Sequence, residues 1–267
     1  MYKSKVMAVI ACSFALLGAR IIGAENSDAP VATLTKIKVG YIGITCEAPL
    51  FVAVEKGFFK EENLEPEMVK CGWSTYKDTL ALGGVDVTHH LIMMYLKPIE
   101  QGMDVKILAG VHKGCLRVQT STGSPIKTLE DLRGKRIGVP GMGTPPFIFA
   151  NRALATHGLD PTKDVTWQVF PVGELGLALE KGLVDAIATV EPISTLLASS
   201  GKVRNLADQA TDEPFASEYC CAVVANGKFV ATNPKVAAAA TFGLLATNFP
   251  FATTAQQYSL AKGSSVA

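Results

Sequence analysis

From residue 36 onward, two hydrophobic periodicities alternate along the chain. Short runs rich in β-branched residues predict strands, and stretches with an apolar residue at every third or fourth position predict helices. After the first predicted strand, Leu50, Val54 and Phe58 lie four residues apart and form one apolar stripe. Pro49 suits the first turn of this helix, and Gly57 suits its end. Alternating strands and helices indicate parallel sheets with crossover helices, an α/β fold.

The expected strands cover residues 36–42, 67–69, 85–88, 105–111, 165–170, 184–190 and 219–225, with a short one after Gly134. The expected helices cover residues 49–57, 74–81, 94–101, 147–157, 174–181, 193–199 and 235–246, with a short one near Thr128. We expect a first part of lobe one at 36–118, lobe two at 119–218, and a return to lobe one at 219–267. The last part, 248–267, has weak periodicity and predicts a short tail or a truncated end.

The N-terminus has the pattern of a secretory signal peptide. Lys3 and Lys5 precede an apolar run at 6–19, and small residues follow at Gly23 and Ala24. We expect residues 1–24 to be removed and the protein to be periplasmic or extracellular. An alternative interpretation takes residues 9–12 as a lipoprotein box, with a lipid anchor on Cys12.

Composition excludes several classes of function. The 25 Lys and Arg residues nearly balance the 24 Asp and Glu residues, so no basic surface for nucleic acid is expected. The sequence has no nucleophile elbow, phosphate-binding loop or zinc-protease motif, and we expect no catalytic residue. Of six cysteines, five remain after loss of the signal peptide, so at least one free thiol is expected. A disulfide between Cys220 and Cys221 would be strained.

Four separated blocks carry a family resemblance. Residues 49–64 read P-L-F-V-A-V-E-K-G-F-F-K-E-E-N-L, and the others are 128–140, 182–192 and 229–239. Together they resemble the periplasmic solute-binding proteins of nitrate, sulfonate and taurine ABC importers, an NMT1-like domain. The resemblance covers residues 36 to about 246.

This resemblance implies a type II periplasmic-binding-protein fold, with two lobes of mixed β-sheets flanked by helices and a hinge between them. It further implies capture of a small solute, sulfonate-, nitrate-, taurine- or pyrimidine-like, by hinge closure. The implied partners are an ABC permease and its ATPase, with the binding protein expected to be a monomer without a cofactor.

Ligands of open α/β sheets bind at the carboxyl ends of the strands. This rule points to the loops at 43–47, 71–75, 88–90, 112–115 and the turns in lobe two. The candidate ligand-binding residues on these loops are Thr45, Cys46, Glu47, Trp73, Ser74, His89, His90, Gly143, Thr144 and Glu191.

The turn from Gly141 to Thr144 has a mechanism for holding an anion. Thr144 could cap a helix that starts with Pro145 and Pro146, while the glycines let backbone approach a ligand. The alternative is an ordinary strand–helix turn.

The acids give a different indication of ligand charge. Glu47 and Glu191 would suit an amine or a pyrimidine, and Lys113 is the one well-placed cation in these loops. Alternatively, both acids cap helices or pair with lysines. Trp73 either stacks on a planar ligand or packs in the core.

The cysteines and histidines leave a further alternative open. Thiolate and imidazole together could hold a transition metal; the residues concerned are Cys46, Cys71, His89, His90, His112 and Cys115. Small-hydrophobe behaviour of Cys, or a Cys46–Cys71 disulfide, is the favoured alternative, and we expect no metal. His89 and His90 are adjacent on a strand, so at most one faces the cleft.

An enzyme remains the alternative function. The superfamily includes metal-dependent synthases of the thiamine pyrimidine, which use a His, cysteines and iron. Their H-C-C-C-F-C cluster is missing from this sequence, and those synthases are cytosolic.

Overall fold

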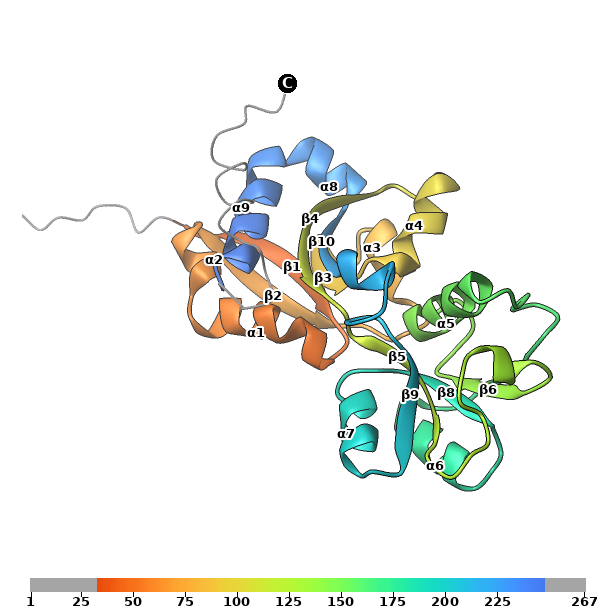
Figure 1. Cartoon of the computed structure of the whole chain (residues 1–267). Helices are drawn as coiled ribbons and strands as arrows, with labels where there is room; N and C mark the ends of the chain where they lie inside the picture. Colours follow the sequence, from red (N-terminus) through yellow and green to blue (C-terminus); the bar gives the residue numbers. More distant parts are fainter. Residues whose placement is uncertain (1–32, 248–267) are drawn as a thin grey trace, which may run out of the picture. The chain divides into compact units, whose positions relative to one another are not determined.

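The computed structural model describes residues 33–247, which fold around two mixed five-stranded sheets (Figure 1). The predicted α/β class with two sheets is confirmed. The predicted signal peptide, Cys12 and the predicted tail lie outside the described residues. No helix in the described range is long and apolar enough to span a bilayer.

The first sheet has the order β2-β1-β3-β10-β4. Its strands are β1 (Thr35–Tyr41), β2 (Leu64–Lys70), β3 (Val87–Leu91), β4 (Val105–Lys113) and β10 (Tyr219–Asn226). Strand β1 runs parallel to β2 and β3, whereas β10 is antiparallel to both β3 and β4. The last strand of the described residues, β10, therefore lies inside the first sheet, between β3 and β4.

The second sheet has the order β7-β6-β8-β5-β9. Its strands are β5 (Leu116–Ser121), β6 (Arg136–Val139), β7 (Thr166–Val169), β8 (Ala186–Val190) and β9 (Val203–Asp208). Strands β5 and β9 were not predicted, because polar residues occupy buried positions in β5. Gln119 donates to Ser194 O at 3.0 Å, and Thr120 donates to Asp185 O at 2.8 Å, so both side chains are satisfied without water.

Helices cover both faces of each sheet (Figure 1). One apolar cluster joins the first sheet to α1 (Ala48–Glu55), α2 (Phe58–Glu61) and α9 (Pro234–Leu245), with α8 (Gly227–Thr232) beside it. A second cluster joins the other face to α3 (Tyr76–Ala81) and α4 (Met93–Glu100). The second sheet packs on α5 (Pro145–Thr156) on one face, and on α6 (Leu175–Glu180) and α7 (Ile193–Ser199) on the other. Short 3-10 turns complete the elements: η1 (Thr45–Glu47), η2 (Glu130–Leu132), η3 (Val172–Glu174) and η4 (Phe215–Ser217).

The described chain passes between the two sheets twice. It leaves the first sheet after Lys113, enters the second at Leu116, and returns between Asp208 and Tyr219. The two passages are in close contact at Gly114. A Cβ on this residue would overlap Ala210, and its φ of +55° also favours glycine.

A disulfide between Cys115 and Cys220 links the same two passages. The Cys46–Cys71 pairing considered from the sequence is wrong. Among the described cysteines, Cys46, Cys71 and Cys221 are free, and the Cys71 sulfur lies 3.6 Å from Val69 O instead.

Candidate functional site

A pocket of about 610 Å³ lies beside the two passages between the sheets. Its wall combines residues from the β1–α1 connection, the end of β4, both passages and the end of β8. The residues that line it are Thr45, Cys46, Ala48, Pro49, His112, Lys113, Gly114, Cys115, Arg117, Glu191, Ala210 and Ala216. Thr45, Cys46 and Glu191 are therefore the predicted site residues that share this pocket.

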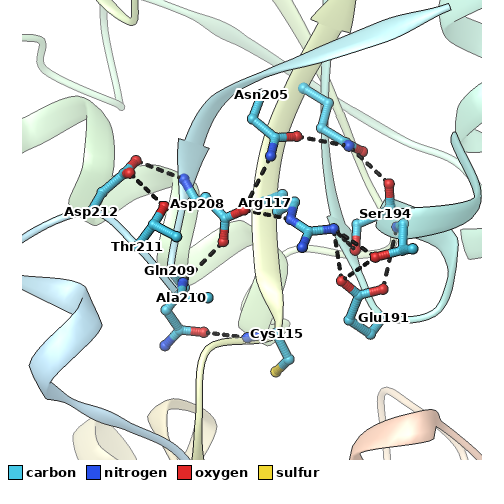
Figure 2. Close-up of polar contacts among 12 residues, drawn as sticks. Cys115, Arg117, Glu191, Ser194, Asn205, Asp208, Gln209, Ala210, Thr211 and Asp212 are labelled. Carbon is cyan, nitrogen blue, oxygen red and sulfur yellow. Dashed lines mark hydrogen bonds and ion pairs between the residues drawn. The ribbon is translucent and has the colours of Figure 1, made fainter. Parts of the chain in front are cut away.

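Arg117 is the charged centre of the second-sheet side of the pocket (Figure 2). Its Nε lies 2.7 Å from Asp208 Oδ2 and its Nη1 lies 2.7 Å from Glu191 Oε1. Its side chain is 20% exposed, so this pair of carboxylates balances a largely buried guanidinium. Glu191 also accepts from Thr195 Oγ1 at 2.8 Å and from Thr195 N at 3.2 Å, which caps the start of α7.

Arg117 was missed by the sequence analysis, which named Lys113 as the one well-placed cation. The residue is the second position of β5, a strand whose buried polar residues hid it. In the sheet it pairs with Thr189 of β8 and with Asp208 of β9, which explains both its place and one of its carboxylate partners. Lys113 does line the pocket and is exposed.

Glu47 does not line the pocket, and its carboxylate oxygens accept hydrogen bonds from backbone N–H groups. The side chain is fully buried and accepts from the N–H of Ile42 at 3.0 Å, of Gly43 at 2.7 Å and of Ile44 at 3.2 Å. Burial raises the pKa of Glu47 to about 7, although the three N–H donors oppose the rise. Glu47 thus caps the start of η1, which is the helix-capping alternative considered for it.

His89 and His90 are both fully buried in β3 and point to opposite faces of the sheet, as predicted for neighbours on a strand. The His90 ring stacks on Tyr76 with ring centroids 4.0 Å apart, and the His89 ring meets the edge of His112 at 5.6 Å. Neither lines the pocket. Burial lowers the pKa of both, that of His90 to about 3, so neither offers a positive charge to an anion at neutral pH.

Cys46 and His112 form the polar part of the first-sheet wall. Hydrogen bonding with Cys221, together with the neighbouring His112 imidazole, lowers the pKa of Cys46 to about 6 against the effect of burial. Burial lowers the pKa of His112, but the Cys46 sulfur raises it, and the net pKa lies above its ordinary value. At neutral pH the Cys46 sulfur is therefore mainly a thiolate, held beside the His112 ring.

The glycine-rich turn before α5 lies apart from the lining residues. Thr144 occupies the N-cap position, as predicted, but its hydroxyl donates to Gly141 O at 2.6 Å instead of accepting from the helix. Pro145 and Pro146 have no N–H, so the start of α5 offers few free donors to an anion. Gly143 is exposed, with a φ of +74°.

The remaining two candidates lie on the loop after β2. Trp73 is half-buried, packs on the core and meets the His90 ring edge-on at 6.4 Å. Ser74 is exposed, and neither residue lines the pocket. The packing alternative considered for Trp73 therefore describes its contacts.

A family model described as the NMT1-like family matches residues 31–261. The chain belongs to the NMT1-like family. It is 27% identical over 188 residues to the nitrate/nitrite binding protein NrtA of Nostoc sp., a match that covers 62% of this chain and 43% of that protein. It is 26% identical over 257 residues to the bicarbonate-binding protein CmpA of Synechococcus elongatus, covering 83% of this chain and 54% of that protein.

The chain thus spans about half the length of the curated relatives that it matches. Among solved structures, it resembles the alkanesulfonate-binding protein SsuA of Xanthomonas axonopodis pv. citri bound to MOPS, with a TM-score of 0.67 and 19% identity. That match covers 80% of this chain and 73% of the solved one, and it confirms the expected binding-protein fold. The relatives are named as binding proteins, so the comparisons do not support the enzyme alternative.

Proposed function

We propose that this chain is the substrate-binding component of an ABC importer, which captures a small solute and delivers it to a permease and its ATPase. The main observation in support is a pocket at the passages between the sheets, whose wall contains residues from both sheets. Family membership supports the class of function, and a further relative is named as a nitrate import ATP-binding protein. The relatives' function also supports a periplasmic place of action.

The proposed mechanism is hinge closure about the two passages. Thr45 and Cys46 reach the pocket from the first sheet, whereas Arg117 and Glu191 reach it from the second. A solute in contact with both sets stabilises the arrangement that brings them together, and its differential contacts supply the closing free energy. Gly114 lies where the two passages touch, so we assign it to the hinge.

The chemistry of the wall narrows the solute class. Asp208 and Glu191 more than neutralise Arg117, so Lys113 is the cation among the lining residues that remains free to contact an anion. The apolar part of the wall consists of Ala48, Pro49, Ala210 and Ala216. We infer a compact anionic head on a short apolar body, the chemistry of an alkanesulfonate, as the preferred solute. A bare nitrate would leave the apolar part of the wall unused.

Calorimetric titration of the purified protein with ethanesulfonate, taurine, nitrate and bicarbonate tests this proposal. We expect saturable binding of ethanesulfonate at one site, weaker binding of nitrate, and no turnover. Lys113→Ala should weaken binding at least tenfold. The matched control is Lys127→Ala, because Lys127 is an exposed lysine that does not line the pocket.

Absence of binding by every solute, or equal losses in Lys113→Ala and Lys127→Ala, would contradict the proposal. Preference for nitrate over ethanesulfonate would keep the transport function and reject the assigned solute class.

A further inference from the structure

Three neighbouring strands of the first sheet bring two histidines and a cysteine together. His89 lies on β3, Cys221 on β10 and His112 on β4, and β10 is the middle strand of the three. Cys221 and His112 are direct partners in the β10–β4 register. A ring nitrogen of each histidine and the Cys221 sulfur lie within 4.8 Å of one another. All three residues are buried.

The imidazoles of this cluster have ring nitrogens that no protein group satisfies. Both nitrogens of His89 and Nε2 of His112 are buried without a hydrogen-bond partner. The other nitrogen of His112, Nδ1, lies 3.3 Å from Lys113 O, a contact that places the proton on Nδ1 and the lone pair on Nε2. A histidine that binds a metal through one ring nitrogen commonly donates its other ring N–H to a backbone carbonyl in this way. Buried polar atoms without partners require such an explanation.

A fourth donor comes from outside the sheet. Cys46, on the η1 turn, is a free buried cysteine, and its sulfur lies within 4.8 Å of those of Cys221 and Cys115. Cys115 is bonded to Cys220, so its sulfur is already committed. The donors that remain are two thiols and two imidazoles.

We propose that Cys46, His89, His112 and Cys221 bind one four-coordinate transition-metal ion, zinc(II) or copper(I). Thiolate and imidazole donors select these ions over magnesium and calcium, which prefer oxygen. A tetrahedral zinc site places its donor atoms roughly 3.3–3.8 Å apart, so shifts of about 1 Å close the His89, His112 and Cys221 donors around an ion, and Cys46 approaches it from beside Cys221.

The assignment differs from the sequence expectation, which was no metal. It also differs from the set of cysteines and histidines considered there, because Cys71 and His90 are excluded and Cys221 is added. Cys46 and His112 line the solute pocket, so the ion would lie directly behind its wall. The inference does not rest on the proposed transport function, since metal binding is measured without solute.

Cobalt(II) titration followed by absorption spectroscopy tests the site. The full protein is purified anaerobically without reductant, which preserves the Cys115–Cys220 disulfide and the two free thiols. We expect one equivalent of cobalt to produce thiolate-to-metal charge transfer and the intense visible bands of tetrahedral coordination. Zinc should displace the cobalt and raise the melting temperature, and competition with a copper(I) chelator distinguishes the two candidate ions.

Matched variants separate ligands from neighbours. His89→Gln and Cys46→Ser should weaken cobalt binding at least a hundredfold and alter the spectrum. The controls are His90→Gln, the adjacent fully buried histidine, and Cys71→Ser, another free cysteine. Both controls should bind cobalt like the unmodified protein.

If a ligand variant fails to fold, cobalt binding by the unmodified protein still tests the proposal. Lack of tetrahedral cobalt bands in the folded, unmodified protein would overturn the proposal. Loss of binding in His90→Gln as large as that in His89→Gln, with both variants folded by circular dichroism, would overturn it as well.

Discussion

The carboxylate of Glu47 makes a quantitative prediction about pH and stability. The group is fully buried, and three consecutive backbone N–H groups, from Ile42 to Ile44, donate to it. Burial favours the neutral acid and raises its pKa from 4.5 to about 7. The perturbation is Glu47→Gln, which fixes the side chain in a neutral form at every pH.

The difference in the pKa of Glu47 between the folded and unfolded states sets the size of the change in unfolding free energy. Because the folded state binds the proton more tightly than the unfolded chain, the stabilising contribution is full below about pH 4.5 and is lost as the pH rises through 7. A rise from 4.5 to about 7 corresponds to about 3 kcal/mol of unfolding free energy. The parent protein should therefore lose about 3 kcal/mol relative to Glu47→Gln between pH 4.5 and pH 8.5.

Urea unfolding at several pH values, with EDTA present, measures this difference. Tryptophan fluorescence reports the transition, since the sequence contains two tryptophans. At pH 5 the variant should be less stable than the parent, because the NH2 group of its amide would face a backbone N–H, and two donors cannot form a hydrogen bond. Glu55→Gln, an exposed position on α1, is the control and should show no such pH-dependent difference.

A stability difference between parent and Glu47→Gln that stays constant from pH 5 to pH 8 would refute the reasoning. A difference that changes in the opposite direction would show that the three N–H donors, and not burial, control this carboxylate.

Two further predictions concern the passages between the sheets. Gly114→Ala should destabilise the protein by about 3 kcal/mol, because the new Cβ overlaps Ala210 and the φ is positive; thermal unfolding beside Gly123→Ala, which has room for a Cβ, checks this, and equal melting temperatures would contradict it. Replacing Cys115 and Cys220 together by Ser should lower the unfolding free energy by about 4 kcal/mol, because the disulfide spans 105 residues. An unchanged urea midpoint for this double variant would exclude that contribution.

Hydrophobic periodicity predicted most of the first sheet and its helices, since their core positions are occupied by apolar residues at regular spacing. It failed at β5, where Gln119 and Thr120 are buried. Their side-chain hydrogen bonds to segments 65 or more residues away replace the apolar contacts that the pattern requires. A local window contains no sign of those partners. Arg117 was missed for the same reason, because its site role depends on the strand that carries it.

The strand-end rule brought the loops at 43–47 and 112–115 and Glu191 to the pocket, but not the loops at 71–75, 88–90 and 141–144, and it gave no direction for the side chains. Thr45 and Cys46 reach the pocket, whereas their neighbour Glu47 turns inward to three backbone N–H groups. On β3 the same uncertainty applies to His89 and His90, which face opposite sides of a sheet covered on both. Alternation along a strand shows that the two differ, but only the covering helices decide that neither reaches solvent.

The cysteine–histidine cluster depends on topology even more strongly. His89 and His112 come from parallel strands, and the strand that separates them, β10, is supplied by a segment more than 100 residues later in the chain. Cys221 meets His112 only because β10 enters antiparallel in that register, and a one-residue slip would turn its thiol to the opposite face. The neighbouring residue Cys220 bonds Cys115 instead. The adjacent cysteines, which the sequence shows only as a pair unsuited to a mutual disulfide, thus have different partners: Cys220 forms a disulfide, whereas Cys221 stays a free thiol that meets His112.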